Sequence, residues 1–290
     1  IDGNKRSTGK ETLRIENVNF VAEGQWQSSI LASKNTYVHN VTVDACTFTG
    51  TDAKEVYGIR LYSSYNITVK NTTGTKLYDL VYAQTAVDGF VAENITVTES
   101  ANGFWFPYGK NPSFKNITIS ETAGMGIGIS NNNSGTATFE NCNISAGTAI
   151  YLGEYNDVTK SYQLIFNGTN TFGENWLVVE GTTANFKVVV NDEGLDMTKT
   201  SGLVAYEGNK YYNTLAYAVK DAAANVTVLK AHEITKTAVV EKDMTIDFAG
   251  LAITGNVFPV VRVQKDADVT VMNGNINNND YVFVLGASDG

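Results

Sequence analysis

One short phrase recurs along the first half of the chain: an asparagine followed by an apolar, a polar and an apolar residue. Its six copies begin at Asn17, Asn40, Asn66, Asn94, Asn116 and Asn141. Successive copies lie 22 to 28 residues apart. Apolar and polar residues alternate within a copy, which is the period of a β-strand and not of a helix. A repeat of this length is too short for a pair of helices, so it predicts a stack of short strands.

A second alternating phrase precedes the asparagine phrase from the second copy on. Its copies span residues 29–33, 58–62, 79–83, 103–107, 126–130 and 149–153. Two or three short strands per repeat fit one coil of a parallel β-helix, whose strands pair with their equivalents in the adjacent coils. We expect two inward columns of side chains. The first is Ile30, Ile59, Leu80, Phe104, Ile127 and Ile150, and the second is Ala32, Leu61, Tyr82, Phe106, Ile129 and Leu152.

The repeated asparagine has a physical use at the corner of a coil. Asparagine tolerates a left-handed backbone, and its side-chain amide can bond to the asparagine of the next coil. This role accounts for the 31 asparagines, and the need of interior strands for every N–H accounts for only 3 prolines. Several copies also form Asn-x-Thr glycosylation sequons, such as Asn94-Ile-Thr, which we interpret as a by-product of a corner asparagine followed by an outward threonine.

These phrases resemble those of right-handed parallel β-helix proteins of the pectin-lyase-like superfamily. The resemblance lies in the alternating Asn-Ile-Thr-Val and Gly-Ile-x-Leu phrases and covers about residues 13 to 155. It implies an all-β fold, a right-handed parallel β-helix or solenoid. Because many functions occur on one fold, the resemblance implies the architecture more strongly than any activity.

The pattern changes in the second half of the chain. Residues 213–224 place apolar side chains at helical spacing, with Asn213 as the expected N-cap. Strands are expected next at 226–229, 244–246, 269–272 and 281–285. The stretch from Tyr211 resembles the opening of β-helical modules repeated in large bacterial surface proteins. We therefore expect a β-helix domain at 1–207 and, at 208–290, the start of a second β-helical segment whose open end is covered by the short helix.

Composition removes several classes of protein. A net charge of −9 disfavours binding to nucleic acid, and no apolar run approaches the roughly 20 residues of a membrane span. Two His and two Cys exclude a His-rich metal site and a disulfide scaffold, and we expect no metal and no cofactor. Cys46 and Cys142 belong to distant coils, which makes a disulfide between them improbable and predicts two buried thiols.

The residues that catalyse reactions in related enzymes are missing. The Asn-Thr-Asp, Asp-Asp, Gly-His-Gly and Arg-Ile-Lys motifs of polygalacturonase-like enzymes do not occur. Glycoside hydrolysis normally uses two carboxylates across the scissile bond, and the outward strand positions offer no pair. Glu154 is isolated, and Asp79 and Asp88 are expected at turns. Adjacent coils also lack the stacked aspartates that would form the Ca²⁺ site of a lyase.

One group of outward residues suggests binding. The middle position of the second phrase runs Leu31, Arg60, Val81, Trp105, Gly128 and Tyr151. Stacking should bring five side chains onto one elongated face: Arg60, Tyr62, Trp105, Tyr108 and Tyr151. Flat aromatic rings with polar groups between them suit sugar rings, and Gly128 should leave a gap between two of the aromatics. The alternative is that these aromatics pack beneath a loop or reflect strand propensity.

The sequence therefore predicts a non-catalytic module of a secreted or cell-surface bacterial protein, acting as an adhesin, a stalk or a glycan-binding module. Its partners would be a polysaccharide or host glycan and neighbouring β-helical modules of a longer chain, of which this sequence would be a fragment or a processed part. A polysaccharide lyase or glycoside hydrolase of the pectin-lyase-like type is the first alternative, and a phage tailspike-like fibre is the second.

Overall fold

A computed structural model shows two compact units, which are described separately. The first contains residues 1–184 and 190–201, and the second contains residues 185–189 and 202–290. The boundary expected at residue 207 stays a prediction. The structure describes residues 12–31, 38–52, 54–85, 87–106, 109–130, 134–153, 161–180, 185–264 and 266–286.

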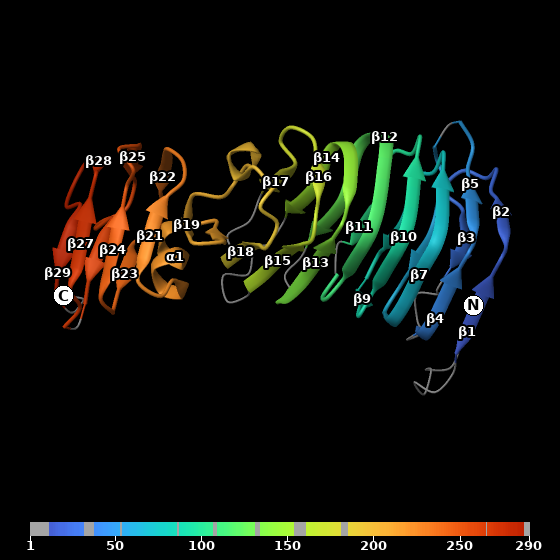
Figure 1. Cartoon of the computed structure of the whole chain (residues 1–290), viewed down its shortest axis with the longest axis horizontal. Helices are drawn as coiled ribbons and strands as arrows, with labels where there is room; N and C mark the ends of the chain where they lie inside the picture. The colour runs from blue at the N-terminus through green and yellow to red at the C-terminus, as the bar shows by residue number, and fades with distance from the viewer. Residues whose placement is uncertain are drawn as a thin grey trace. The chain divides into compact units, whose positions relative to one another are not determined.

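The first unit is a parallel β-helix (Figure 1), and the pairing of its strands defines three faces of the coil. Face A comprises β3 (Ser28–Leu31), β6 (Tyr57–Leu61), β8 (Asp79–Ala83), β11 (Phe104–Phe106), the ends of β12 (Ser113–Ser130) and β14 (Asn143–Gly153), and β17 (Leu177–Glu180). Face B comprises β1 (Leu13–Glu16), β4 (Val38–Asp44), the start of β7 (Ser64–Thr75), β9 (Val87–Asp88), the starts of β10 (Val91–Thr98) and β12, β13 (Gly135–Glu140) and β15 (Ser161–Asn167). Face C comprises β2 (Asn19–Val21), β5 (Thr47–Thr49), the ends of β7 and β10, the middle of β12, the start of β14, and β16 (Thr171–Phe172). A 3-10 helix, Met197–Lys199, follows these coils.

Inward side chains of successive coils stack on one another and form the core. On face B, Phe114, Phe139 and Phe166 are in register and almost fully buried. Their rings stack at centroid distances of 5.3 and 4.8 Å. One coil exposes its inner residues on both sides, so burial is complete only when coils stack. The predicted parallel β-helix is thus confirmed, and Cys46 and Cys142 are buried free thiols as expected.

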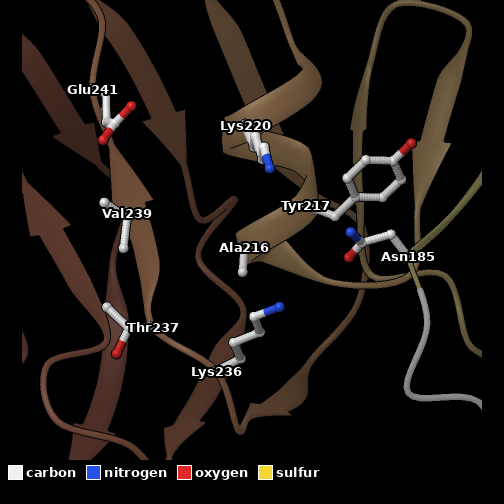
Figure 2. Close-up of a pocket in the computed structure, with 8 residues that line it drawn as sticks. All are labelled: Asn185, Ala216, Tyr217, Lys220, Lys236, Thr237, Val239 and Glu241. Atoms are coloured by element: carbon white, nitrogen blue, oxygen red, sulfur yellow. The ribbon is translucent and has the colours of Figure 1, made fainter. Parts of the chain in front are cut away.

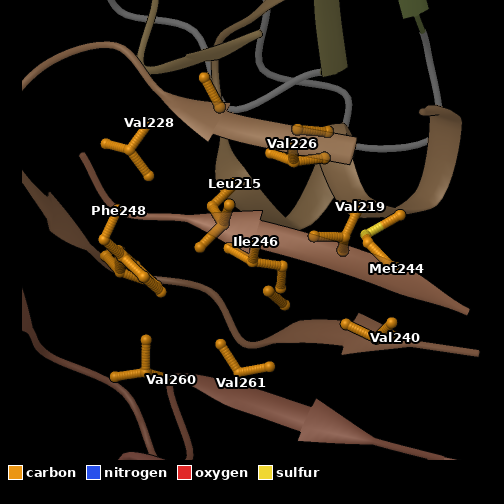
Figure 3. Close-up of a cluster of buried hydrophobic side chains, with 14 of the residues drawn as sticks. Leu215, Val219, Val226, Val228, Val240, Met244, Ile246, Phe248, Val260 and Val261 are labelled. Atoms are coloured by element: carbon orange, nitrogen blue, oxygen red, sulfur yellow. The ribbon is translucent and has the colours of Figure 1, made fainter. Parts of the chain in front are cut away.

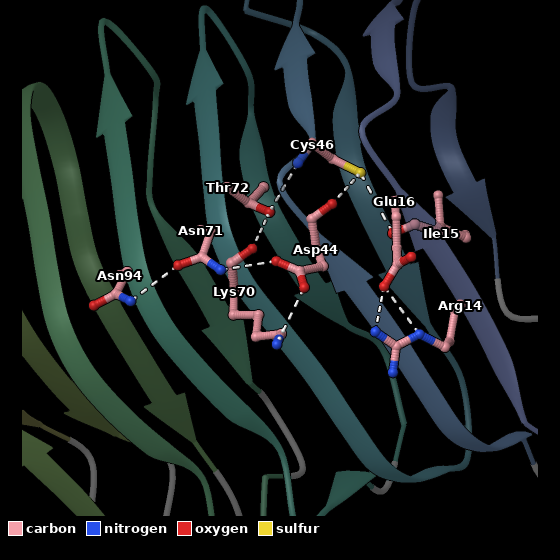
Figure 4. A network of polar contacts seen from close by, with 9 residues as sticks. All are labelled: Arg14, Ile15, Glu16, Asp44, Cys46, Lys70, Asn71, Thr72 and Asn94. Carbon is pink, nitrogen blue, oxygen red and sulfur yellow. Dashed lines mark hydrogen bonds and ion pairs between the residues drawn. The ribbon is translucent and has the colours of Figure 1, made fainter.

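Asparagines at the corners form two separate ladders of hydrogen bonds; Figure 4 shows the Asn71–Asn94 contact of the second ladder. Asn66 donates to Asn40 at 3.3 Å, and the next coil places Gly89 near Asn66. Asn94 instead donates to Asn71 at 2.9 Å. The ladder then continues through Asn116 and Asn141, at 2.8 and 3.4 Å. The expected single series was therefore wrong between Asn66 and Asn94, because the same phrase serves two different corners.

The ladder asparagines adopt the left-handed backbone that the corners require. Asn116 has φ of 52°. We expect Asn116→Ala to destabilise the protein by about 1–2 kcal/mol, because alanine is strained in this conformation and cannot continue the ladder. Asn116→Gly should cost less, since glycine removes the strain and loses only the side-chain bonds. Urea unfolding of both variants measures the difference, and equal losses would show that backbone conformation does not matter here.

The second unit repeats the three-sided architecture on a smaller scale. Its strands form three sets of parallel neighbours. The first set is β21 (Asn225–Val228), β24 (Met244–Asp247) and β27 (Val269–Met272). The second set is β22 (His232–Ile234), β25 (Ala252–Gly255) and β28 (Asn275–Asn278), and the third is β23 (Ala238–Val240), β26 (Val261–Val263) and β29 (Phe283–Leu285). Antiparallel strands precede them: β18 (Asn185–Val190), β19 (Ala205–Glu207) and β20 (Lys210–Tyr212). The coil spacing expected from Asp243 and Asp268 is confirmed, because the Asp268 N–H donates to Asp243 at 2.8 Å.

A short helix, α1 (Leu215–Asp221), covers one end of this second core. Leu215, Ala218 and Val219 are buried against strand residues such as Val226 and Ile246 (Figure 3). The covering role is as expected, but the N-cap is Thr214 and not Asn213, since the Thr214 hydroxyl accepts from the Tyr217 N–H at 3.0 Å. The Asn213 side chain instead accepts a hydrogen bond from the Phe186 N–H at 3.0 Å.

Candidate functional site

The outward side chains of face A form a continuous row across the coils. In register, this row contains Leu31, Arg60, Tyr82, Trp105, Gly128, Tyr151 and Val178. The inward neighbours of the row are Ile30, Ile59, Val81, Phe104, Ile127 and Ile150, all buried. The row is therefore anchored on a packed core.

One coil of face A has the opposite phase to the one expected. Val81 and Ala83 point inward, whereas the sequence pattern was interpreted with Leu80 and Tyr82 inside. Leu80 is also fully buried: the N–H groups of Leu80 and Val81 both donate to the Gly103 oxygen, and the Leu80 side chain lies near Gly58 and Gly74. Ala32 lies outside the described residues. The correction moves Tyr82 onto the outer row between Arg60 and Trp105.

Arg60 is the centre of a cluster of tyrosines. Its guanidinium carbon lies 5.3 Å from the ring centre of Tyr57, 5.6 Å from that of Tyr62 and 5.5 Å from that of Tyr82. These distances are typical of cation–π contacts. Gln84 fixes the arginine, since its carbonyl oxygen accepts from Arg60 Nε at 3.1 Å and Nη2 at 2.5 Å, and also from the Tyr62 hydroxyl. The guanidinium is thereby held in one orientation.

Two further aromatic residues extend this cluster. The Trp26 ring lies 5.1 Å from that of Tyr78 and 6.3 Å from that of Tyr57. Tyr57 also contacts Tyr78 at 5.5 Å and Tyr82 at 5.1 Å. Partial burial raises the pKa of Tyr57 to about 12, so its hydroxyl is protonated at neutral pH. Trp26 is 50% exposed, which leaves a large aromatic surface open to solvent.

A second pair of rings lies further along the row. Trp105 and Tyr151 are two coils apart, and their ring centres are 6.1 Å from one another. Gly128 lies between them, and a Cβ atom there would collide with the indole ring of Trp105. The expected gap at Gly128 was therefore wrong: the glycine gives room for the tryptophan to lie across it. We name the following eight side chains the aromatic face: Trp26, Tyr57, Arg60, Tyr62, Tyr78, Tyr82, Trp105 and Tyr151. Tyr57 and Tyr62 are buried, at 8% and 9% exposure, so they support the face from below, and the expected outward position of Tyr62 was wrong.

A buried carboxyl group belongs to this region. Asp79 is the first residue of β8 and not a turn residue as expected, and only 1% of it is exposed. It is in register with Tyr57. Neither carboxyl oxygen has hydrogen-bond geometry to another described group. Burial raises the pKa of Asp79 to about 7, and the nearby Asn102 side chain lowers it only in part. Asp88, also expected at a turn, is the last residue of β9.

Sequence reasoning selected part of this surface. The structure brings Arg60 and Tyr62 together at Gln84, and Trp105 and Tyr151 together over Gly128. Tyr108 and Glu154 lie outside the described residues. The pattern missed Trp26, Tyr57, Tyr78 and Tyr82. Tyr57 and Tyr78 precede the alternating phrases by one residue, and a search for aromatics just outside those phrases would have found them.

Two other findings concern the described residues alone. They contain no group of three or more His, Cys, Asp or Glu side chains arranged to hold a metal ion. Within the same part of the chain, no helix has the length and apolar character needed to cross a membrane.

Comparison with known proteins identifies the family of the chain. A family model described as a right-handed β-helix region matches residues 6–219. This chain belongs to the right-handed β-helix family. The expected resemblance to pectin-lyase-like β-helix proteins is thus confirmed at the level of fold. The search of curated proteins and the search of solved structures each found no match.

Proposed function

We propose that this β-helix module binds glycans without cleaving them and does so through the aromatic face. The observation that carries the proposal is the row of aromatic rings around Arg60, which continues through Trp105 to Tyr151. As a binding module of this kind it would act outside the cell or at the cell surface, as an adhesin or a stalk that presents the site, with polysaccharides or host glycans as partners.

The chemistry of the aromatic face suits sugars. A sugar ring has an apolar face of C–H groups and a rim of hydroxyl groups. The exposed half of Trp26 and the partly exposed rings of Trp105 and Tyr151 offer flat apolar surfaces for the C–H face of the sugar. The guanidinium of Arg60 and the hydroxyl groups of the half-buried Tyr78 and Tyr82 can bond to the hydroxyl rim of the sugar. Because packing and Gln84 hold the arginine, little side-chain entropy is lost on binding.

The same surface is poorly suited to hydrolysis. Glycosidases use two carboxyl groups on opposite sides of the scissile bond. None of the eight side chains of the aromatic face carries a carboxyl group, and Asp79 beneath them is 1% exposed, which is too little for contact with a glycan. The arrangement therefore favours a binding role over the lyase or hydrolase alternative.

Tryptophan fluorescence and a glycan array test the proposal. Of the 3 tryptophans, Trp26 and Trp105 lie on the aromatic face, whereas Trp176 is buried in the core. We expect a glycan identified on the array to change the fluorescence of the wild-type protein. Trp105→Ala should weaken binding about tenfold, the loss of one ring-stacking contact. The double variant Trp26→Ala/Trp105→Ala should lose the glycan signal on the array, a measurement that does not depend on the tryptophans removed.

Tyr281→Ala is a matched control, because this aromatic side chain is 71% exposed and lies in the second unit. It should bind like the wild type. A complete array without a bound glycan would overturn the proposal. Release of shortened products or unsaturated sugars from a bound polysaccharide would overturn its non-catalytic part.

A further inference from the structure

The second unit contains a cavity that the aromatic face does not involve. It measures about 310 Å³ and lies between the outer surface of α1 and the segment around β23 (Figure 2). Ala216, Tyr217 and Lys220 line it from the helix. Lys236, Val239 and Glu241 line it from the opposite side. The volume is at the lower end of the range for small-molecule sites.

Two lysines face this cavity without acidic partners. Within the described residues, neither Lys220 nor Lys236 forms an ion pair through its side chain, and both are exposed. Lys187 of the same unit differs, since its ammonium contacts Asp221 at 3.0 Å. The cavity is lined by these two lysines and one carboxylate, Glu241, so its lining has an excess of one positive charge in a chain whose net charge is −9. Such a cavity attracts an anion.

The remaining lining residues favour an organic anion over an inorganic ion as the ligand of the cavity. Val239 is 36% exposed, and its side chain gives the cavity an apolar wall. The Asn185 amide can both donate and accept hydrogen bonds. Glu241 lies on the opposite side of the cavity from Asn185 (Figure 2) and can accept a hydrogen bond from a hydroxyl group of a ligand. The negative charge of Glu241 disfavours the binding of a compact dianion. The space is also larger than an inorganic anion needs.

The walls of the cavity are held in place. The helix packs on the core of the unit through Leu215, Ala218 and Val219. Its C-terminal carbonyl groups are fixed by Lys242, whose ammonium donates to the Lys220 oxygen at 3.1 Å and to the Ala222 oxygen. This lysine follows β23 in sequence and so ties the helix to that side of the cavity. A preformed cavity loses little entropy when a ligand binds.

We propose that this cavity binds a small polyhydroxylated carboxylate of the sugar-acid class. The carboxylate lies between the ammonium groups of Lys220 and Lys236. The carbon skeleton packs on Val239, and hydroxyl groups bond to Asn185 and Glu241. The site is independent of the glycan-binding proposal, because it lies in the other unit and uses none of its residues.

Calorimetry and NMR on the full chain test this site with D-glucuronate as the probe, at low salt. We expect glucuronate to bind and D-glucose, which lacks the carboxylate, not to bind. Lys220→Gln and Lys236→Gln should each weaken glucuronate binding about tenfold, the loss of one charge-assisted hydrogen bond. In protein with ¹³C-methylated lysines, the signals of these two residues should shift on titration.

Two controls separate this site from non-specific attraction to lysines and from the aromatic face. Lys199→Gln removes a lysine from the first unit, where it pairs with the exposed Glu174, and should leave glucuronate binding unchanged. The double variant Trp26→Ala/Trp105→Ala should also bind glucuronate normally, so the two proposals can fail separately. Absence of glucuronate binding, or binding unaffected by both cavity variants, would overturn the inference. Inorganic phosphate binding as tightly as glucuronate would overturn the sugar-acid assignment.

Discussion

Replacing Asp79 with asparagine is expected to stabilise the protein by up to about 4 kcal/mol above pH 7. The carboxyl group has a pKa near 3.8 in the unfolded chain and about 7 in the folded protein. Below pH 3.8 it is protonated in both states and has no effect. Between these two values only the unfolded state ionises fully, so the wild type loses stability as the pH rises. Asparagine has the same shape and no ionisation cost, and the desolvation of its buried amide keeps the gain below this upper value.

Urea unfolding at pH 4, 6 and 8 measures this effect. The advantage of Asp79→Asn should grow from pH 4 to pH 7 and then remain constant. Asp247→Asn is a control of opposite sign, because bonds from Asn273 and the Ala249 N–H lower the pKa of this exposed carboxyl group. A destabilised Asp79→Asn variant at pH 8 would contradict the prediction and show that the carboxylate is well solvated or bonded.

Removing one ring from the stacked column of face B should have an effect of similar size. Phe139 is fully buried, and its ring stacks between those of Phe114 and Phe166. We expect Phe139→Ala to reduce the free energy of unfolding by about 3–5 kcal/mol. The loss combines the transfer of the ring to water with a cavity that the coils above and below cannot close.

Thermal and urea unfolding followed by circular dichroism measure this loss. Phe139→Leu should recover a large part of the stability, because leucine fills most of the cavity. Tyr281→Ala, at an aromatic position that is 71% exposed, should change the stability by less than about 0.5 kcal/mol. A loss at Phe139 no greater than at Tyr281 would mean that stacked aromatics do not stabilise the coils.

Alternation and spacing were sufficient to predict the class of fold, because both are imposed locally by the strands and corners. Alternation and spacing were insufficient to predict which alternate residues of a strand point toward the core. In the segment Asp79–Ala83, either Leu80 and Tyr82 or Val81 and Ala83 can point inward by pattern alone. The choice depends on neighbours in the adjacent coils, which here place Val81 between Ile59 and Phe104. The sequence of one strand alone does not contain these contacts with the adjacent coils.

The asparagine phrases show the same difficulty at the corners. Asn66 and Asn94 begin identical Asn-Ile-Thr-Val phrases, yet Ile95 pairs with Thr72 and not with Ile67. The 28-residue interval between the two asparagines is the signal that was available, since it is longer than the 23 residues that separate Asn71 from its partner Asn94. In the candidate site, likewise, Arg60 and Trp105 were predictable from strand positions, whereas Tyr57 and Tyr78 depend on how the chain enters each strand.

The coil-to-coil pairing has a consequence for how the protein is assembled. Paired residues such as Asn94 and Asn116 are separated by a single repeat, here 22 residues. A contact therefore forms as soon as the next coil is available and does not wait for distant parts of the chain. Folding can propagate along the solenoid, because each new coil pairs with the edge strands of the coil that has already folded. Within each stack the order of synthesis can thus become the order of folding, and the number of repeats, not the closure of a sheet, determines the length.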